Sequence, residues 1–143
     1  MREEEARLTY SIRQIEGIGP AMAAKLASIR IRTTAGLLEA ASTAKGRKKI
    51  ADEIGVDEQT VLRWANLADR MRVKGVREPY AELLRAAGVD TVRELKYRNV
   101  ENLAQALAEA NRKRKLVTLL PTEKHVKRWI DDAKKLPPKI SYK

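Results

Sequence analysis

The sequence predicts an all-α protein built from two similar units of short helices. The apolar residues are mainly Ala, Leu, Ile and Val, because the chain has no Phe and only 4% aromatic residues. Ala and Leu favour helices, and no segment shows the alternation of apolar and polar residues that marks a half-buried strand. A weak repeat at a constant offset of 58 residues indicates that a helical unit has been duplicated.

The repeat defines the expected domain organisation. The matching pairs include Ile15 with Val73, Gly17 with Gly75, Ile18 with Val76, Leu26 with Leu84 and Thr33 with Thr91. Further along, the register slips by seven residues, so that Trp64 corresponds to Trp129 and the extra residues lie around 111–119. We therefore expect an N-terminal arm over 1–14, units at 15–72 and 73–137, and a flexible tail over 138–143.

Capping residues mark the helices of the first half. A short turn after Ser11 precedes helices expected over about 20–29, around 37–38, over 47–54 and from 58 to about 71, the last being the longest. Proline is favoured as a first helical residue, Thr33 or Thr34 and Asp57 are suitable N-caps, and Gly55 is a natural left-handed terminator.

The second half shows similar signals. Helices are expected from Glu78-Pro79 to about 87, through 91–95, over about 100–107, and from Pro121-Thr122 to the Pro137-Pro138 pair. Thr91 and Asn99 are the expected caps, and Gly88 ends the first of these helices. Each tryptophan lies on the apolar face of its helix, which favours a core role over the alternative of stacking on bases.

The segment Gly17-Ile18-Gly19, followed by Pro20, predicts a tight hairpin at the start of a helix. The first N–H groups of a helix have no intrahelical partner and carry partial positive charge, so such a turn can hold an anion. The phosphodiester of a nucleic acid is the expected anion, and Lys25 could add a mobile charge about one turn into the helix. The alternative is that the glycines only allow two helices to pack at a sharp angle.

At this hairpin the chain resembles the helix-hairpin-helix modules of DNA repair and processing proteins, which hold backbone phosphates without reading bases. The resemblance places the hairpin at Gly17, Ile18 and Gly19 in the first unit and at Gly75, Val76 and Arg77 in the second. The second copy departs from the pattern, because Arg77 replaces a glycine. If that position requires a positive φ, the second turn is strained or altered, although the Arg77 guanidinium could still contact a phosphate.

The charge of the chain also favours a polyanionic partner. Its formal net charge is +11, of which residues 73–143 contribute +8. Such a surface attracts nucleic acid first, and an anionic membrane or an acidic protein second. The expected nucleic-acid contacts are Gly17, Ile18, Gly19, Lys25, Lys45, Arg47, Lys48, Lys49, Gly75, Arg77, Arg112, Lys113, Arg114 and Lys115. The alternative for any one cluster is an ordinary solvated face.

Residues 47–64 resemble a bacterial helix-turn-helix, with Gly55 at the turn and Glu58, Gln59, Thr60 and Arg63 facing the major groove. That arrangement would imply sequence-specific binding. We rank it lower, because a helix that begins with Asp57 and Glu58 would be repelled by phosphates, and because the second half keeps the Val-x-x-Trp helix without the glycine turn.

Catalysis, metal binding and membrane insertion find no support in the sequence. The chain has no Cys and one His, and we find no nucleophile with a base or paired carboxylates at workable spacing, so we expect neither an enzyme nor a bound cofactor or metal. The N-terminus lacks a secretion signal, and no apolar run is long enough to span a membrane. A soluble protein of the reducing cytoplasm is expected.

Most of the chain, from about 12 to 137, resembles a bacterial family described only as a domain of unknown function and built of tandem helix-hairpin-helix units. The resemblance rests on the segments IEGIGP, SIRIRTTAGLLEA, KGRKKIADEIGV and LPTEKHVKRWIDDAKKLP. It implies an all-helical fold related to helix-hairpin-helix and sterile-alpha-motif-like domains, packed into one compact domain. The expected function is a non-enzymatic module that binds DNA without sequence preference; the alternative is a scaffold that docks an acidic protein.

Overall fold

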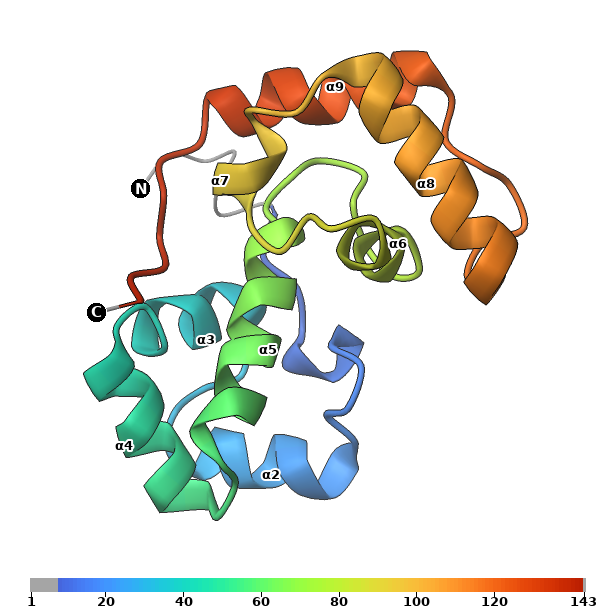
Figure 1. The fold of residues 1–143 in the computed structure, drawn as a ribbon. Helices are drawn as coiled ribbons and strands as arrows, with labels where there is room; N and C mark the ends of the chain where they lie inside the picture. The colour runs from blue at the N-terminus through green and yellow to red at the C-terminus, as the bar shows by residue number, and fades with distance from the viewer. Residues whose placement is uncertain (1–7, 143) are drawn as a thin grey trace. The chain divides into compact units, whose positions relative to one another are not determined.

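The computed structural model describes residues 8–142, and within that range every regular element is helical (Figure 1). The elements are η1 Ile12–Gln14, α2 Pro20–Ser28, α3 Thr34–Ala40, α4 Ala44–Ile54, α5 Glu58–Arg70, α6 Tyr80–Ala86, α7 Val92–Leu95, α8 Val100–Arg114 and α9 Glu123–Lys134. An isolated antiparallel bridge joins Ser11 and Thr33. The predicted all-α class is confirmed.

The contacts divide the chain into two compact units. The first extends to Asp69 and includes the segment from Lys139 onward, and the second is Arg70–Pro138. The boundary falls at the end of α5, a few residues before the expected one. Most of the expected N-terminal arm, residues 1–7, lies outside the described residues.

Local side-chain caps start the helices of the first unit. Thr33 Oγ1 accepts a hydrogen bond from the Gly36 amide at 3.0 Å, and Asp57 Oδ1 accepts one from the Thr60 amide at 2.8 Å. Helix α4 begins three residues earlier than expected because Thr43 caps it in the same way. It ends at Gly55, whose φ of 77° is the left-handed value that glycine adopts without strain.

Helix α5, with 13 residues, is the longest helix described in the first unit, as expected, and α8 in the second unit has 15. Asn99 caps α8 through the Asn102 amide at 2.9 Å, and the helix continues through Arg112, Lys113 and Arg114. The second half has extra residues, relative to the first half, at about 111–119. The first of them extend α8 to Arg114, and the rest belong to the loop before α9. Thr122 then caps α9.

The segment after Pro138 packs against the first unit and differs from the expected flexible tail. Ile140 is buried, the Ser141 amide donates to the Ser42 carbonyl at 2.7 Å, and the Tyr142 hydroxyl lies 3.3 Å from Asn66 Oδ1. Burial of Ile140 and the hydrogen bond of the Ser141 amide both stabilise this packing. Charge and proline content alone could not predict this packing.

Candidate nucleic-acid interface

Buried isoleucines and one glycine with positive φ form the first hairpin. Ile15 and Ile18 are buried, and the Ile18 amide donates to the Ile15 carbonyl at 3.1 Å. Gly17 lies between them with a φ of 95°. Ile18 was among the expected nucleic-acid contacts. The structure corrects this, because its side chain is in the core and its amide already has an acceptor.

The open donors of the hairpin are at the start of α2. Gly19 is the N-cap, no side chain of the described residues caps the helix, and Pro20 has no N–H to offer. Within residues 8–142, the amides of Gly19, Ala21 and Met22 have no acceptor; the first helical bond runs from the Ala23 amide to the Gly19 carbonyl at 2.8 Å. These amides add their partial charges to the positive end of the helix dipole, which favours an anion at this point.

The two hairpin glycines have different roles. Gly19 has a φ of −86°, which any residue can adopt, and a Cβ added there would meet no atom within 4 Å. Position 19 therefore does not require a positive φ, and neither does Arg77, the aligned residue of the second hairpin, which is not among the positive-φ residues. The expected strain at Arg77 is absent. Gly19 instead leaves open space next to the amides.

A glycine lies against a tryptophan in each unit. A Cβ on Gly17 would lie 3.5 Å from Trp64 Nε1, and a Cβ on Gly75 would lie 3.6 Å from Trp129 Nε1. Both glycines have positive φ, 95° and 86° respectively. The repeat aligns Gly17 with Gly75 and Trp64 with Trp129. In both units the glycine lies against the indole nitrogen of the aligned tryptophan.

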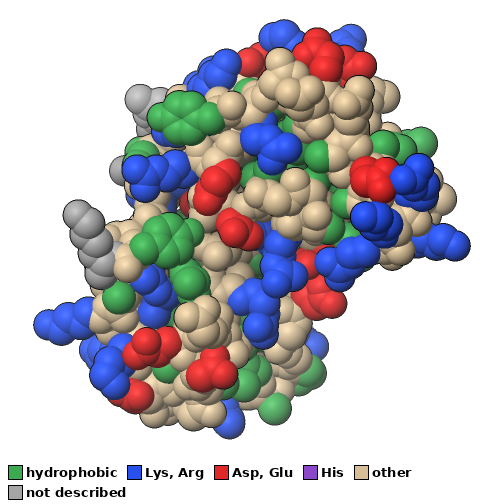
Figure 2. Space-filling view, in the orientation of Figure 1, with side chains coloured by type: hydrophobic (Ala, Val, Ile, Leu, Met, Phe, Trp, Pro, Cys, Tyr) green, Lys and Arg blue, Asp and Glu red, His purple; other side chains and the backbone are tan. Residues whose placement is uncertain are grey.

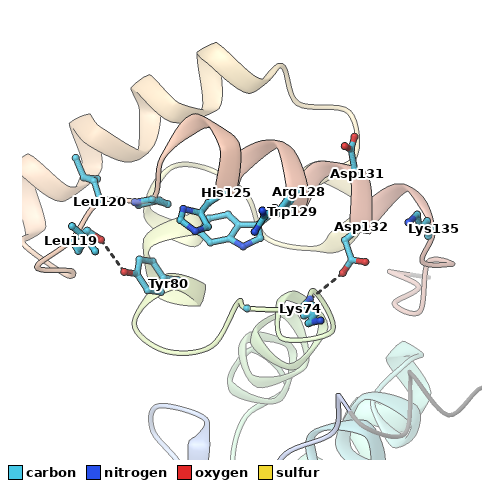
Figure 3. Close-up of a pocket in the computed structure, with 12 residues that line it drawn as sticks. Lys74, Tyr80, Leu119, Leu120, His125, Arg128, Trp129, Asp131, Asp132 and Lys135 are labelled. Atoms are coloured by element: carbon cyan, nitrogen blue, oxygen red, sulfur yellow. Dashed lines mark hydrogen bonds between the residues drawn. The ribbon is translucent and has the colours of Figure 1, made fainter.

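In the second hairpin, one donor beside Gly75 has a side-chain partner. The Lys74 amide donates to Asp132 Oδ2 at 3.0 Å, so a carboxylate of α9 already occupies that donor (Figure 3). Helix α6 begins at Tyr80, five residues after Gly75, whereas α2 begins three residues after Gly17. Gly75 and Arg77 are exposed, but they do not adjoin a helix start as Gly19 does.

Lys25 is exposed in the last turn of α2. It follows Ala21 by four residues, so the two side chains lie on the same face of the helix. Because Cα–Cβ bonds of a helix tilt toward its N-terminus, a lysine at this position can extend along the helix toward the open amides. The role of Lys25 at a bound anion stays a prediction.

The cluster at the start of α4 is divided between surface and core. Lys45, Lys48 and Lys49 are exposed, and Lys48 forms an ion pair with Asp52 at 3.3 Å. Arg47 was expected to contact nucleic acid, but it is only 5% exposed. Its guanidinium donates to the Ala41 carbonyl at 2.9 Å and to the Ser141 carbonyl at 2.8 Å. Burial lowers the pKa of Arg47. We therefore reassign Arg47 as a structural residue.

The helix that carries Lys45, Lys48 and Lys49 and the segment that carries the first hairpin are different parts of the first unit. Within the first unit, α4 and the segment that leads into α2 lie on either side of α5 (Figure 1). Figure 2 shows basic side chains dispersed over the visible face, with acidic side chains between them.

An acidic neighbour partly neutralises the basic cluster at the end of α8. Glu109 pairs with Arg112 in a close contact and with Lys113 at 3.7 Å. The hydrogen bond from Arg112 holds the pKa of Glu109 below its usual value, so the carboxylate stays charged. Arg114 and Lys115 are exposed and have no such partner in the described part of the chain.

Sequence reasoning missed a groove of about 780 Å³ in the second unit (Figure 3). Tyr80 and Trp129 line it, with ring centroids 6.0 Å apart, and so do Leu119 and Leu120 from the loop before α9. The available signal was the group of extra residues at 111–119, which the first half lacks.

The comparisons with known proteins identify a family and give no function. The model of a family described as "Domain of unknown function (DUF4332)" matches residues 16–136. No curated protein and no solved structure matched the chain. Among residues 8–142, no helix has the length and apolar character needed to cross a membrane.

Proposed function

The chain belongs to the DUF4332 family, a domain of unknown function, and from the geometry of its first hairpin we propose that it is a non-enzymatic module that binds DNA without sequence preference. One observation carries the proposal: among residues 8–142, the amides at the start of α2 have no acceptor, and no atom fills the space beside Gly19. A phosphodiester oxygen is an anion of suitable size for these donors, and contacts of this kind carry affinity without base information.

The basic side chains would act mainly through their combined field. A net charge of +11 attracts a polyanion over a distance set by the ionic strength. Lys25 would contact the bound phosphate or its neighbour, whereas Lys45, Lys49, Arg114 and Lys115 would raise the local concentration of DNA. The dissociation constant should then lie at about 10⁻⁴ to 10⁻⁶ M at physiological salt.

The matching contacts of Gly17 with Trp64 and of Gly75 with Trp129 support two tandem helix-hairpin-helix-like units. In this proposal the first hairpin binds phosphate, and the second serves as a scaffold. The second is assigned this role because Gly75 and Arg77 do not adjoin a helix start, since α6 begins only at Tyr80.

The helix-turn-helix alternative is weaker. The side chains that would face the major groove include Glu58, Gln59 and Arg63, which are exposed, so the argument against this alternative rests on charge. The exposed start of α5 carries Asp57 and Glu58, and the hydrogen bond from the Thr60 amide lowers the pKa of Asp57, which keeps its charge negative. Phosphates would repel that end of the helix. The remaining alternative, a scaffold whose basic surface docks an acidic protein, is separated by the experiment below.

The test is fluorescence anisotropy of a labelled duplex of arbitrary sequence, titrated with the protein at several salt concentrations. Gly19→Asp places a carboxylate on the open amides and, as a good N-cap, should raise stability by about 0.5–1 kcal/mol. Gly19→Asn supplies the cap without the charge. Ala24→Asp adds the same charge at an exposed position of α2 that is not next to the open amides. Because aspartate and asparagine are both favoured at an N-cap, a loss of DNA binding in the two Gly19 variants cannot be attributed to misfolding.

If the hairpin holds a phosphate, Gly19→Asp weakens binding about tenfold more than Ala24→Asp and lowers the salt slope by about one ion. Gly19→Asn gives an intermediate loss, because its amide oxygen competes with the phosphate. If Gly19→Asp and Ala24→Asp weaken binding equally and Gly19→Asn has no effect, the hairpin is not the site. A general basic surface would then remain as the explanation.

A further inference from the structure

The groove of the second unit combines an aromatic floor with aliphatic walls. Trp129 and Tyr80 form the floor, and Leu119 and Leu120 stand at one end, next to His125 (Figure 3). The exposed fractions of the two leucines are 75% and 40%, which is high for large aliphatic side chains. Adjacent exposed apolar residues beside a hollow are typical of a surface that contacts another molecule.

Hydrogen bonds hold the loop that presents the leucines. Asn111 bonds both backbone groups of Val117, accepting from its amide at 2.9 Å and donating to its carbonyl at 3.1 Å. The Tyr80 hydroxyl donates to the Leu119 carbonyl at 2.9 Å. The leucines are therefore presented in a fixed geometry, and a partner would not have to order the loop first.

The charged rim of the groove favours an anionic partner. Its acidic groups are already engaged: Asp131 pairs with Lys127 at 2.8 Å, and Asp132 accepts from the Lys74 amide at 3.0 Å. By contrast, the side-chain ammonium of Lys74 and the guanidinium of Arg128 have no carboxylate within 4.0 Å in the part of the chain that the structure describes. The groove thus offers apolar contact together with uncommitted positive charge.

We propose that this groove binds a short peptide segment of a partner protein, in which a bulky aliphatic side chain lies next to carboxylates. The aliphatic side chain would pack against Leu119, Leu120 and the floor of the groove, and the carboxylates would pair with Arg128 and Lys74. This site is of a different class from the phosphate site at Gly19, and it does not depend on that proposal.

A peptide fits the groove better than nucleic acid does. Trp129 is only 6% exposed, so it offers no open face on which a base could stack. The exposed leucines gain from burial against aliphatic groups, which a sugar-phosphate chain lacks.

The probe is a fluorescein-labelled dodecapeptide of alternating leucine and glutamate pairs, titrated into the whole protein. Two analogues control for chemistry: lysine replaces glutamate in one, and serine replaces leucine in the other. In a parallel NMR titration with the unlabelled peptide, the indole N–H signal of Trp129 reports on the groove, and that of Trp64, buried in the first unit, is the internal control. The variants are Leu119→Ser and Arg128→Glu, each at an exposed side chain.

The proposal expects saturable binding with a dissociation constant below about 1 mM and movement of the Trp129 signal without that of Trp64. Leu119→Ser and Arg128→Glu should each weaken binding about fivefold or more. The matched controls Tyr97→Ser, which removes an exposed apolar side chain elsewhere, and Lys49→Glu should change it less than about twofold. The proposal is overturned by absence of binding, by equal binding of either analogue, by no effect of Leu119→Ser, or by displacement of the peptide by duplex DNA.

Discussion

The first prediction tests whether Arg47 is a structural residue or a nucleic-acid contact. The hydrogen bonds of its guanidinium allow its contribution to the free energy of unfolding to be estimated. Its guanidinium donates to the Ala41 and Ser141 carbonyls and so links α4 to the segment after Pro138. We compare Arg47→Met, which keeps the apolar stem but makes neither bond, with Lys49→Met, which removes a charge from an exposed position of the same helix.

The magnitude follows from two charged donors. A hydrogen bond from a charged group contributes about 1.5–3 kcal/mol net, so two bonds sum to about 3–6 kcal/mol. The cost of burying the guanidinium, which also lowers the pKa of Arg47, offsets part of that sum. We expect Arg47→Met to lower the free energy of unfolding by about 2–4 kcal/mol and Tm by about 5–15 °C. Lys49→Met should change the free energy by less than about 0.5 kcal/mol.

Urea denaturation followed by circular dichroism measures both free energies. A second comparison tests the mechanism: in a variant that ends at Pro138, Arg47→Met should cost about 1–2 kcal/mol less, because the Ser141 carbonyl is already gone. DNA affinity at low salt should fall equally in the two methionine variants, since each removes one positive charge. The structural role of Arg47 is refuted if Arg47→Met is as stable as Lys49→Met, or if only Arg47→Met loses affinity while remaining folded.

Three further predictions concern local structure. Gly17→Ala should lower the free energy of unfolding by about 1–2 kcal/mol, because its φ of 95° disfavours a side chain; chemical denaturation followed by tryptophan fluorescence measures it, and a neutral result would contradict the hairpin geometry. Gly46→Ala should cost about 1–3 kcal/mol despite a helix-propensity gain of about 1 kcal/mol, because its Cβ would lie 2.2 Å from the Ala40 carbonyl oxygen. A higher Tm in that variant would mean that the corner between α3 and α4 is looser. The lowered pKa of Asp57 means that its contribution is complete above the unfolded pKa of about 3.9 and is lost as pH falls through the folded value. Asp57→Asn should therefore show a smaller fall of Tm than the unchanged protein between about pH 5 and pH 2, and equal falls would argue against the cap.

Caps and terminators were predictable because each depends on a few neighbouring residues. Thr33, Asp57 and Asn99 each accept from an amide three residues ahead, and Gly55 takes the left-handed conformation that ends α4. These choices require no knowledge of the tertiary fold. The start of α4 was predicted three residues too late, because Gly46 is a poor helix former and its presence argued against a helix that begins after Thr43.

The error at Arg47 came from giving charge more weight than helical position. Arg47 precedes Ile50, Ala51 and Ile54 at spacings of three, four and seven residues, which places it on the buried face of α4. The sequence therefore contained the signal that Arg47 points inward. Its acceptor at Ser141 was not predictable, because the two residues are 94 positions apart and nothing local links them.

The groove could not be predicted because it depends on how a loop is held. The extra residues after α8 were visible in the sequence, but their conformation rests on the Asn111 bonds to Val117 and on the Tyr80 hydroxyl. Exposed leucines in a loop usually have no special meaning when they are isolated. They become informative only once the structure places them at the edge of a hollow with uncommitted cations.

The two hairpins share one packing contact and differ at a residue near it. Each keeps a glycine with positive φ against the indole nitrogen of a tryptophan. The residue three positions after that tryptophan is Leu67 in the first half and Asp132 in the second, and only the second can offer a carboxylate to a hairpin amide. If an anion is what such a turn attracts, Asp132 already supplies one in the second unit. In our proposal the external phosphate therefore binds at the first hairpin, where Gly19 is the N-cap of α2.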